Sequence, residues 1–489
     1  MSKHWKQLSW RLVLTSFLST VIALAIIPAK MYAQASTDGI YPEVLAKANA
    51  GDAVSQDRVG FFYQQGMGVP QDYALAAAWY RKAADQGNAD AQYWLGRLYE
   101  TGRGVPKDYF QAAFWYRKAA DQGEADSQFE LGTLYEFGQG VSKDYAKAAF
   151  WYRKAADQGR ADSQVALGTL YESGQGVSKD YAKAADWYRK AADQGDADAQ
   201  YHLGSLYENG HGVLNDLDHA ATLYRKAAEQ GNEAAQFQLG NMYDQGKAVP
   251  QDHAQAATWY RKAAEQGSTS AQFNLAVDYS VGEGVPQDYA QAAIWLQKAA
   301  EQGDPKAQLY LARSYDQGKG VPQDHAQAAT WYRKAAEQGN TSAQFNLGES
   351  YDQGEGVPQD HAQAATWYRK AAEQGNTSAQ FNLAVDYSIG EGVPQDYAQA
   401  AIWLQKAAEQ GDAKAQYGLG QAYFKGQGVP QNYAESYFWE DLAAAGAKGS
   451  DEEAYAKARN QAGEKLSPDE LSKVQKRAAT WFVAHPQKP

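Results

Sequence analysis

A unit of 36 residues is repeated along almost the whole chain, and this period limits the folds that the chain can adopt. The copy at residues 88–123 is NADAQYWLGRLYETGRGVPKDYFQAAFWYRKAADQG. A Gly-Val pair marks the same place in most copies, and Ala248 replaces this glycine in one of them. Such self-similarity is typical of solenoids, in which each repeat buries its apolar face only against its neighbours.

The first half of this copy predicts an amphipathic helix. Asn88 is a favourable N-cap residue, and Ala91, Leu95 and Leu98 follow at the spacing of one helical face. Gly102 is placed to end this helix in the left-handed conformation.

The second half predicts another helix. Pro106 disfavours helix before it, and Asp108 with Gln111 three residues later has the spacing of a capping box. Small and aromatic residues form its packing face: Ala112, Ala113, Trp115, Tyr116, Ala119 and Ala120. Each repeat is therefore a helical hairpin, and we predict an all-α solenoid of about eleven hairpins at residues 51–448.

The two ends depart from the repeat. Residues 36–50 resemble half a repeat, in which Glu43–Ala50 forms the last turns of a second helix. Residues 449–489 predict capping helices, because Ser467 and Glu470 form a helix start signal. The helix that follows carries an apolar face of Leu471, Val474, Ala478, Trp481 and Phe482.

Residues 1–35 have the features of a secretory signal. Basic residues precede the apolar run Leu12–Ile27, and Ala33-Gln34-Ala35 fits the small-x-small cleavage rule. The run is shorter than the roughly 20 residues that a membrane-spanning helix needs. We therefore expect an exported protein, periplasmic or secreted, without an integral membrane segment once the signal is cleaved.

One block of the chain is almost duplicated. Asp244–Gln308 matches Asp352–Gln416 at an offset of three repeats, with five differences. This indicates expansion by copying, and the copied block is expected to add length more than individual recognition.

Composition excludes several functions. The chain has no cysteine, so disulfides, thiolate metal sites and a thiol nucleophile are absent. Its formal net charge is −12, and no basic run stands out. Nucleic acid and anionic lipid are therefore not expected as main ligands.

The sequence motifs Leu95-Gly96-x-x-Tyr99, Gly102-x-Gly104-Val105 and Trp115-Tyr116-x-Lys118-Ala119-Ala120 resemble the Sel-one-like repeat, a relative of the tetratricopeptide repeat. The resemblance implies a right-handed α/α superhelix whose first helices line the concave surface. It also implies similarity to exported bacterial factors of envelope assembly, secretion or host contact. A cysteine-rich exported branch is associated with β-lactam binding or hydrolysis, and its disulfide framework is missing here.

Several repeated residues are interpreted as structural. The glutamine at the place of Gln92 is expected to hydrogen-bond backbone in an adjacent hairpin, although a peptide-gripping amide ladder is the alternative. The Trp115-Tyr116 pair is expected in the core, with the indole N–H and the hydroxyl reaching partners. His253, His325 and His361 are interpreted as surface variation. No catalytic, cofactor or metal site is predicted.

An acidic residue near the end of successive first helices is the main candidate for partner binding. We call these residues the acidic stripe: Glu100, Glu136, Glu172, Glu208, Asp244, Asp316 and Asp352. The stripe is interrupted at three repeats, where this position holds Ser280, Ser388 and Phe424. The stripe either binds a basic partner segment or pairs locally with a second-helix cation such as Arg117 or Lys118.

Two positions on the first helix vary between copies and are the other candidates. Trp94, His202 and Tyr310 share one of these positions, and Arg97 belongs to the other. Because they are free to vary, we expect them to be exposed. The sequence thus predicts a non-enzymatic adaptor that binds protein partners, including basic or extended segments, along its concave face. The alternative is a cell-wall or β-lactam hydrolase. The oligomeric state stays open.

Overall fold

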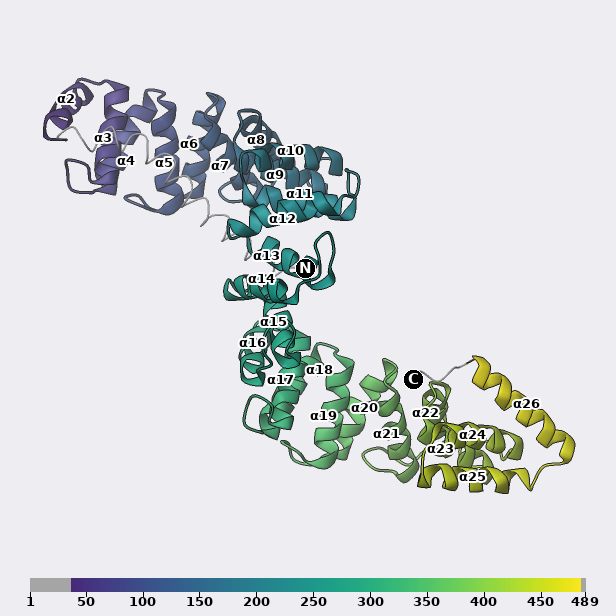
Figure 1. The fold of residues 1–489 in the computed structure, drawn as a ribbon. Coiled ribbons are helices and arrows are strands. Elements are labelled where there is room, and N and C mark those ends of the chain that lie inside the picture. The colour runs from purple at the N-terminus through teal and green to yellow at the C-terminus, as the bar shows by residue number, and fades with distance from the viewer. Residues whose placement is uncertain (1–36, 485–489) are drawn as a thin grey trace. The chain divides into compact units, whose positions relative to one another are not determined.

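The computed structural model describes residues 37–484, which form helices and no strands. Two compact units are present: unit 1 ends at Ala235 and unit 2 begins at Gln236. Within each unit, consecutive helices pair as hairpins and the hairpins stack in chain order as a solenoid (Figure 1). The predicted all-α solenoid is therefore confirmed. The predicted secretory signal at 1–35 lies outside the described residues.

Unit 1 is built from 13-residue helices. They are α2 (Thr37–Asn49), α3 (Ala53–Gln65), α4 (Tyr73–Asp85), α5 (Ala89–Thr101), α6 (Tyr109–Asp121), α7 (Ala125–Phe137), α8 (Tyr145–Asp157), α9 (Ala161–Ser173), α10 (Tyr181–Asp193), α11 (Ala197–Asn209) and α12 (Leu217–Glu229). The boundary between the units falls within α13 (Glu233–Gln245).

Unit 2 continues the same pattern, and its last three helices, α24 to α26, are longer than 13 residues. It contains α14 (His253–Glu265), α15 (Thr269–Val281), α16 (Tyr289–Glu301), α17 (Pro305–Gln317), α18 (His325–Glu337), α19 (Thr341–Gln353), α20 (His361–Glu373), α21 (Thr377–Ile389), α22 (Tyr397–Glu409), α23 (Ala413–Lys425), α24 (Tyr433–Gly446), α25 (Ser450–Gly463) and α26 (Pro468–Ala484). No helix within residues 37–484 is long and apolar enough to cross a membrane.

The predicted boundaries of the first helix are confirmed in α5. The Asn88 side chain accepts a hydrogen bond from the Ala91 N–H at 2.8 Å. Gly102 has φ 71°, and its N–H donates to the Leu98 carbonyl at 2.9 Å. The glycine therefore satisfies a carbonyl that the end of the helix would otherwise leave open.

The start of the second helix differs in one detail from the predicted capping box. The Asp108 carboxylate accepts hydrogen bonds from the N–H groups of Phe110 and Gln111, as expected of an N-cap. The N–H of Asp108, however, donates to the Tyr99 carbonyl of the preceding helix at 2.8 Å. That donor binds the partner helix rather than the Gln111 side chain, so the bond closes the hairpin.

A tyrosine of the second helix packs directly on a glycine of the first helix. A Cβ at Gly96 would lie 2.7 Å from the Tyr116 ring, and the Tyr116 side chain is fully buried. A side chain at Gly96 would therefore displace the Tyr116 ring in this hairpin, whereas the hairpin of α17 and α18 accommodates Ala312 opposite Tyr332, both buried.

The same place shows compensating changes in the duplicated block. Leu296 and Leu404 replace the tyrosine, and Ala276 and Ala384 replace the glycine. All four side chains are buried or nearly so. The smaller aliphatic side chain leaves room for the alanine methyl group, so the two substitutions keep the hairpin core filled.

The C-terminal helices cover the end of the stack. α26 packs on α24, and Val474 and Ala478 are buried there with Leu471 and Trp481 beside them. The predicted capping box at the start of α26 is present, because the Ser467 N–H donates to Glu470 Oε2 at 2.9 Å. The solenoid fold thus ends in the predicted capping helix.

The N-terminal helix differs from the expected short one. The sequence indicated only the last turns at 43–50, whereas α2 extends from Thr37 to Asn49 with Pro42 inside it. Pro42 occupies the sixth position of α2. A proline inside a sequence usually indicates the first turn of a helix or a break in it, so the longer helix was not expected.

Ala248 carries strained backbone. It has φ 57° and is the non-glycine residue with positive φ among residues 37–484. Its sister Gly140 has φ 66°, and a Cβ there would lie 2.2 Å from the Tyr109 carbonyl. Left-handed backbone costs an ordinary L-residue roughly 1–2 kcal/mol.

We predict that Ala248→Gly raises the free energy of unfolding by about 1 kcal/mol, because it removes this strain. Urea denaturation followed by circular dichroism measures the change. Gly140→Ala is the matched opposite variant and is expected to destabilise the protein by more, since its new methyl group would meet backbone. Unchanged stability of Ala248→Gly would contradict the assigned strain.

Candidate functional site

The repeated glutamine links three helices and is buried. In α5, Gln92 Nε2 donates to the Ala84 carbonyl of α4 at 3.0 Å. Its Oε1 accepts a hydrogen bond from Gln122 Nε2, just after α6, at 2.8 Å. The predicted structural role is therefore confirmed, because the amide is occupied within the stack and not available to a peptide.

The repeated aromatic pair is also structural, with one correction. Trp115 and Tyr116 are buried in the core, as predicted, and the Tyr116 hydroxyl donates to Glu100 Oε2 at 2.6 Å. The expected partner of the indole was wrong: Trp115 Nε1 is buried without a hydrogen-bond partner among the described residues. The ring instead faces cations, with the Arg81 guanidinium 5.1 Å from its centre.

In unit 1, the acidic stripe is held by tyrosine hydroxyl groups. The hydroxyl of the second-helix tyrosine donates to Glu136, Glu172 and Glu208 at 2.7 Å in each case. The suggested partners Arg117 and Lys118 were wrong. Arg117 donates to the Tyr135 hydroxyl of the next repeat, and the Lys118 ammonium lies 4.8 Å from the Trp115 ring. The local hydrogen-bond partner of these carboxylates is thus a neutral hydroxyl and not a cation of the second helix.

In unit 2, histidines bind the aspartates of the stripe. His253 Nδ1 lies 2.9 Å from Asp244 Oδ1, and its Nε2 lies 3.1 Å from Glu283 Oε1. His361 makes the equivalent contacts with Asp352 at 2.8 Å and Glu391 at 3.1 Å. The hydrogen bond with Asp352 raises the pKa of His361. The interpretation of these histidines as mere surface variation was therefore wrong.

A third such group is the arrangement most suited to a cation. Asp316, His325 and Glu355 each offer a ligand atom, and these atoms lie within 4.8 Å of one another. Imidazole and carboxylate suit a borderline divalent ion. The three residues are half-buried or exposed, and His325 Nδ1 is already 2.9 Å from Asp316 Oδ1.

Two buried aspartates accompany the histidine groups. Asp278 and Asp386 occupy the place of a core leucine such as Leu98, and Oδ2 of each lacks a hydrogen-bond partner. Burial, together with the nearby negative charge of Asp244 or Asp352 respectively, raises the pKa of each to about 7. Sequence reasoning missed them. The available signal was an acid at a position where sister repeats carry leucine.

The variable first-helix residues are less exposed than predicted. Trp94, Arg97 and His202 are half-buried, whereas Tyr310 is exposed. Arg97 Nη1 contacts Glu130 Oε1 of the next first helix at 2.9 Å, and the Tyr310 ring packs on Phe273 of the preceding first helix with centroids 5.5 Å apart. The ring of His202 stacks on Tyr188 of the second helix α10, with centroids 4.9 Å apart. Successive first helices thus touch at Arg97 and at Tyr310. We call the surface that they form the first-helix face.

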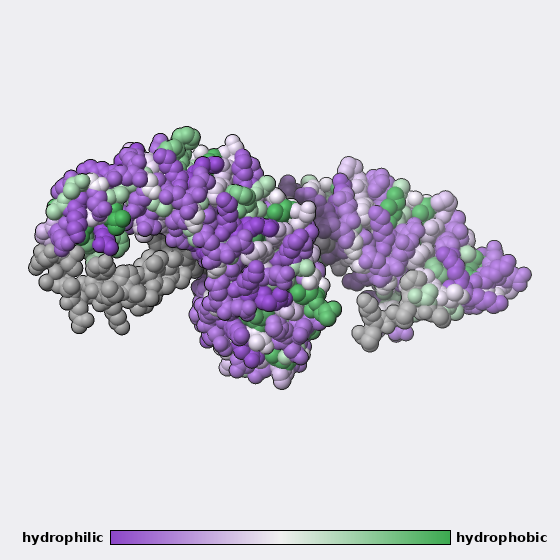
Figure 2. Space-filling model, turned by 90° about the horizontal axis from the view of Figure 1, so that it is seen from above, coloured by the Kyte–Doolittle hydropathy of each residue, from purple (hydrophilic) through white to green (hydrophobic). Residues whose placement is uncertain are grey.

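Exposed aromatic residues on the second helices were also missed. Phe110, Phe114 and Phe150 are exposed on α6 and α8. Sister repeats carry residues such as Asp186 and Thr258 at the position of Phe114 and Phe150, and alanines such as Ala182 at the position of Phe110. The face seen in Figure 2 is mainly hydrophilic with separate hydrophobic spots. The signal in the sequence was phenylalanine at positions where sister repeats carry polar residues or alanine.

The buried aspartates make stability depend on pH. Because the folded-state pKa of Asp278 and Asp386 is about 7, above the ordinary value of 3.8, the folded protein holds more protons than the unfolded chain between these values. Their contribution to stability is fully present below about pH 4 and is lost as the pH rises through 7.

We predict that Asp278→Asn and Asp386→Asn together flatten the pH dependence of the free energy of unfolding between about pH 4 and 7. Each wild-type carboxyl contributes a slope of about 1.4 kcal/mol per pH unit in the middle of this window. Denaturant titrations at several pH values measure it. Asp278→Leu restores the residue of the sister repeats and should give about half of this flattening, because Asp386 still titrates. Identical pH profiles for all variants would contradict the raised pKa values.

Comparison with known proteins places this geometry in a family. The family model described as Sel1 repeat matches eleven consecutive segments: residues 53–88, 89–124, 125–159, 161–196, 197–232, 233–268, 269–304, 305–340, 341–376, 377–412 and 413–447. Comparison with curated proteins gives no match.

Among the solved structures that are similar to the chain, two are Sel1 or SLR proteins about 40% identical to it. c5321, described as a protective antigen present in uropathogenic Escherichia coli strains that displays an SLR fold, is 39% identical, with a TM-score of 0.75 over 91% of this chain and 94% of that protein. A Sel1 repeat protein from Oxalobacter formigenes is 40% identical over 61% of this chain and 87% of its own, with a TM-score of 0.48. The chain therefore belongs to the Sel1 repeat family, whose members are generally scaffolds for protein–protein interaction.

Proposed function

We propose that the protein is a non-enzymatic scaffold that binds protein partners along the first-helix face. The observation that carries this proposal is the division of roles within the repeat. The glutamine amide is the same in all the repeats, and the tyrosine–carboxylate bond recurs in the consecutive repeats from Tyr116 to Tyr224. The residues where successive first helices meet differ. Trp94, Glu130, Ala166 and His202 occupy one such position in four consecutive repeats. A constant frame with a changing surface suits recognition of an extended segment.

The acidic stripe supports a basic or extended partner segment. Glu172, Asp244, Asp316 and Asp352 keep between 32% and 38% of their side-chain surface exposed while they bind local partners. A carboxylate can accept several hydrogen bonds, so a tyrosine hydroxyl does not exhaust it. Lysine or arginine side chains of a partner would add charge-assisted bonds at the regular spacing of the repeats.

The site of action that we propose is the bacterial envelope or a surface in contact with a host. Two observations support it: the basic, apolar and small-residue pattern of residues 1–35, and the similarity to an Escherichia coli protein described as a protective antigen. We infer export to the periplasm or the exterior. Fractionation of cells that express the protein, with the N-terminus of the purified product sequenced, tests this. A cytoplasmic product that retains residue 1 would contradict it.

We predict that Glu136→Gln, Glu172→Gln and Glu208→Gln, combined, weaken capture of the partner about fivefold or more, since each exposed charge pair contributes roughly 0.2–1 kcal/mol. Glutamine still accepts the hydrogen bond of the tyrosine hydroxyl, so folding is retained. Crosslinking of the purified protein to envelope and host extracts, with mass spectrometry, identifies and quantifies the partner.

The matched control removes the donors of the same tyrosine–carboxylate hydrogen bonds. Tyr152→Phe, Tyr188→Phe and Tyr224→Phe remove the hydroxyl groups and keep the carboxylates charged, so capture should persist. Equal capture by the glutamine variant and the wild type would show that the stripe does not bind the partner. Hydrolysis of a chromogenic β-lactam or of peptidoglycan by the purified protein would contradict the non-enzymatic role.

A further inference from the structure

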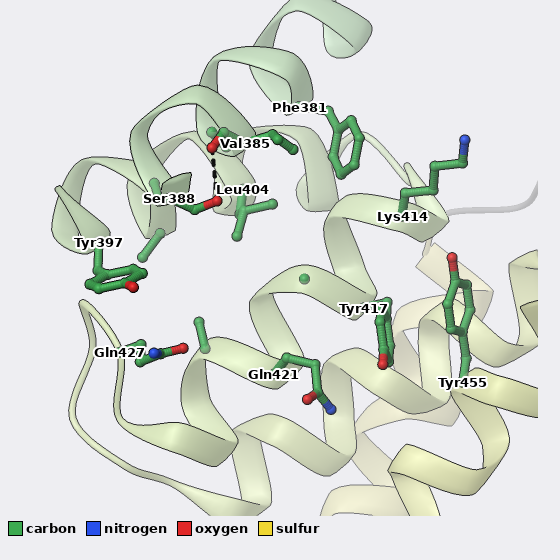
Figure 3. Close-up of a pocket in the computed structure, with 15 residues that line it drawn as sticks. Phe381, Val385, Ser388, Tyr397, Leu404, Lys414, Tyr417, Gln421, Gln427 and Tyr455 are labelled. Atoms are coloured by element: carbon green, nitrogen blue, oxygen red, sulfur yellow. Dashed lines mark hydrogen bonds between the residues drawn. The ribbon is translucent and has the colours of Figure 1, made fainter. Parts of the chain in front are cut away.

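An apolar cavity of about 370 Å³ lies where the last repeats meet the C-terminal helices. Its walls come from α21, α22, α23 and α25, and Phe381, Leu404, Tyr417 and Tyr455 surround it (Figure 3). Tyr417 and Tyr455 stack with ring centroids 4.4 Å apart, so the capping helix α25 supplies part of one wall. The volume falls within the roughly 300–1,000 Å³ of ligand sites.

The lining differs from the corresponding place in the first copy of the duplicated block at the start of α23. The first copy contains Phe273 and Leu296, which correspond to Phe381 and Leu404 in the second copy. Directly after the matching block, the first copy has Leu309-Tyr310 and the second has Tyr417-Gly418. A tyrosine thus lies one residue earlier in the second copy, and position 418 has no side chain.

Tyr310 occupies the corresponding place in the first copy. The ring of Tyr310 packs edge-on against Phe273 with centroids 5.5 Å apart. Gly418 lines the cavity, and a Cβ built on it would lie 3.0 Å from Leu404 Cδ2. The Cβ of a side chain at position 418 would therefore lie in the wall of the cavity. The space that a tyrosine occupies in the first copy is suited to an aromatic ring.

The lining has one charge, and it is positive. Lys414 is exposed at the rim of the cavity, and in this rotamer its ammonium group is directed away from Leu404 and Tyr417 (Figure 3). The residues that line the cavity in the described part of the chain include no aspartate or glutamate. Asp412 and Asp451 act on the Tyr455 hydroxyl from outside the lining. An anionic group beside an aromatic ring thus complements this site.

We propose that this cavity receives an aromatic side chain of a partner polypeptide, with an adjacent carboxylate of the partner facing Lys414. The proposal rests on the proposed function, because it takes the partner to be a protein. An aromatic anchor buried in a pocket is a common centre of binding energy in protein interfaces. The cavity would fix the register of an extended partner at the C-terminal end of the first-helix face.

The test uses the full chain and a defined probe, the peptide acetyl-Gly-(4-fluorophenylalanine)-Asp-Gly-amide, observed by fluorine NMR. We expect a saturable shift of the fluorine signal with the wild-type protein. Gly418→Tyr should weaken binding at least tenfold, because it places in the cavity the ring that Tyr310 supplies in the other copy. Gly418→Val serves if the tyrosine variant misfolds.

A second variant tests the same idea by gain of binding. Tyr310→Gly removes the ring from the first copy and should create a second site for the peptide. Lys414→Gln should weaken binding of this peptide about two- to fivefold, with no change for the peptide that carries Asn in place of Asp. Absence of a saturable shift with the wild type, or wild-type binding by both Gly418 variants, would overturn the proposal.

Free 4-fluorophenylacetate separates a polypeptide from a small molecule. Binding of this acid as tightly as the peptide would overturn the assignment to a polypeptide. The glutamine variants of the acidic stripe test the scaffold function, and their result does not depend on Gly418. The peptide titrations test the cavity. Failure of the cavity proposal and failure of the scaffold proposal are therefore distinguishable.

Discussion

The buried glutamine amide is the interaction on which the stack depends. A helical hairpin of this length has too little apolar surface to fold alone, so its neighbours must be held in register. Each amide donates to the end of the preceding helix and accepts from the end of the following one, as Gln92 does between Ala84 and Gln122. An apolar residue there would leave the Ala84 carbonyl without this buried donor.

The backbone and this amide set the register between neighbouring hairpins. Residues at other positions therefore do not have to set it and can differ between repeats. Inside the hairpin, the glycine–tyrosine contact fills the core, and an alanine–leucine pair fills it equally in the duplicated block. On the first-helix face, residues as different as Trp94 and Ala166 are tolerated at one place. Recognition can therefore change from repeat to repeat without cost to the fold.

Most of the fold could be predicted because its signals are local and are repeated. The cap at Asn88 and the end at Gly102 follow from short-range chemistry; the left-handed glycine recurs from repeat to repeat, and the side-chain cap is missing at Arg160 and Ser268. The candidate site was less predictable, because its partners belong to different repeats. Nothing in the spacing shows that Glu100 meets the Tyr116 hydroxyl while Arg117 reaches Tyr135, since several cations and hydroxyl groups are within reach of each carboxylate. The cavity also escaped detection, because it depends on the absence of a side chain at Gly418 and on the position of α25.

The near-identical block has a consequence for how such a chain can change in length. Thr269 Oγ1 donates to Gln302 at 2.9 Å, and Thr377 Oγ1 donates to Gln410 in the same way, also at 2.9 Å. Junctions inside the two copies are thus interchangeable, and recombination between them would delete or add three hairpins while every remaining surface still finds a matching neighbour. The reach of the molecule can evolve in whole-repeat steps, whereas the aromatic cavity, which needs the capping helices, stays at the end of the stack whatever the length.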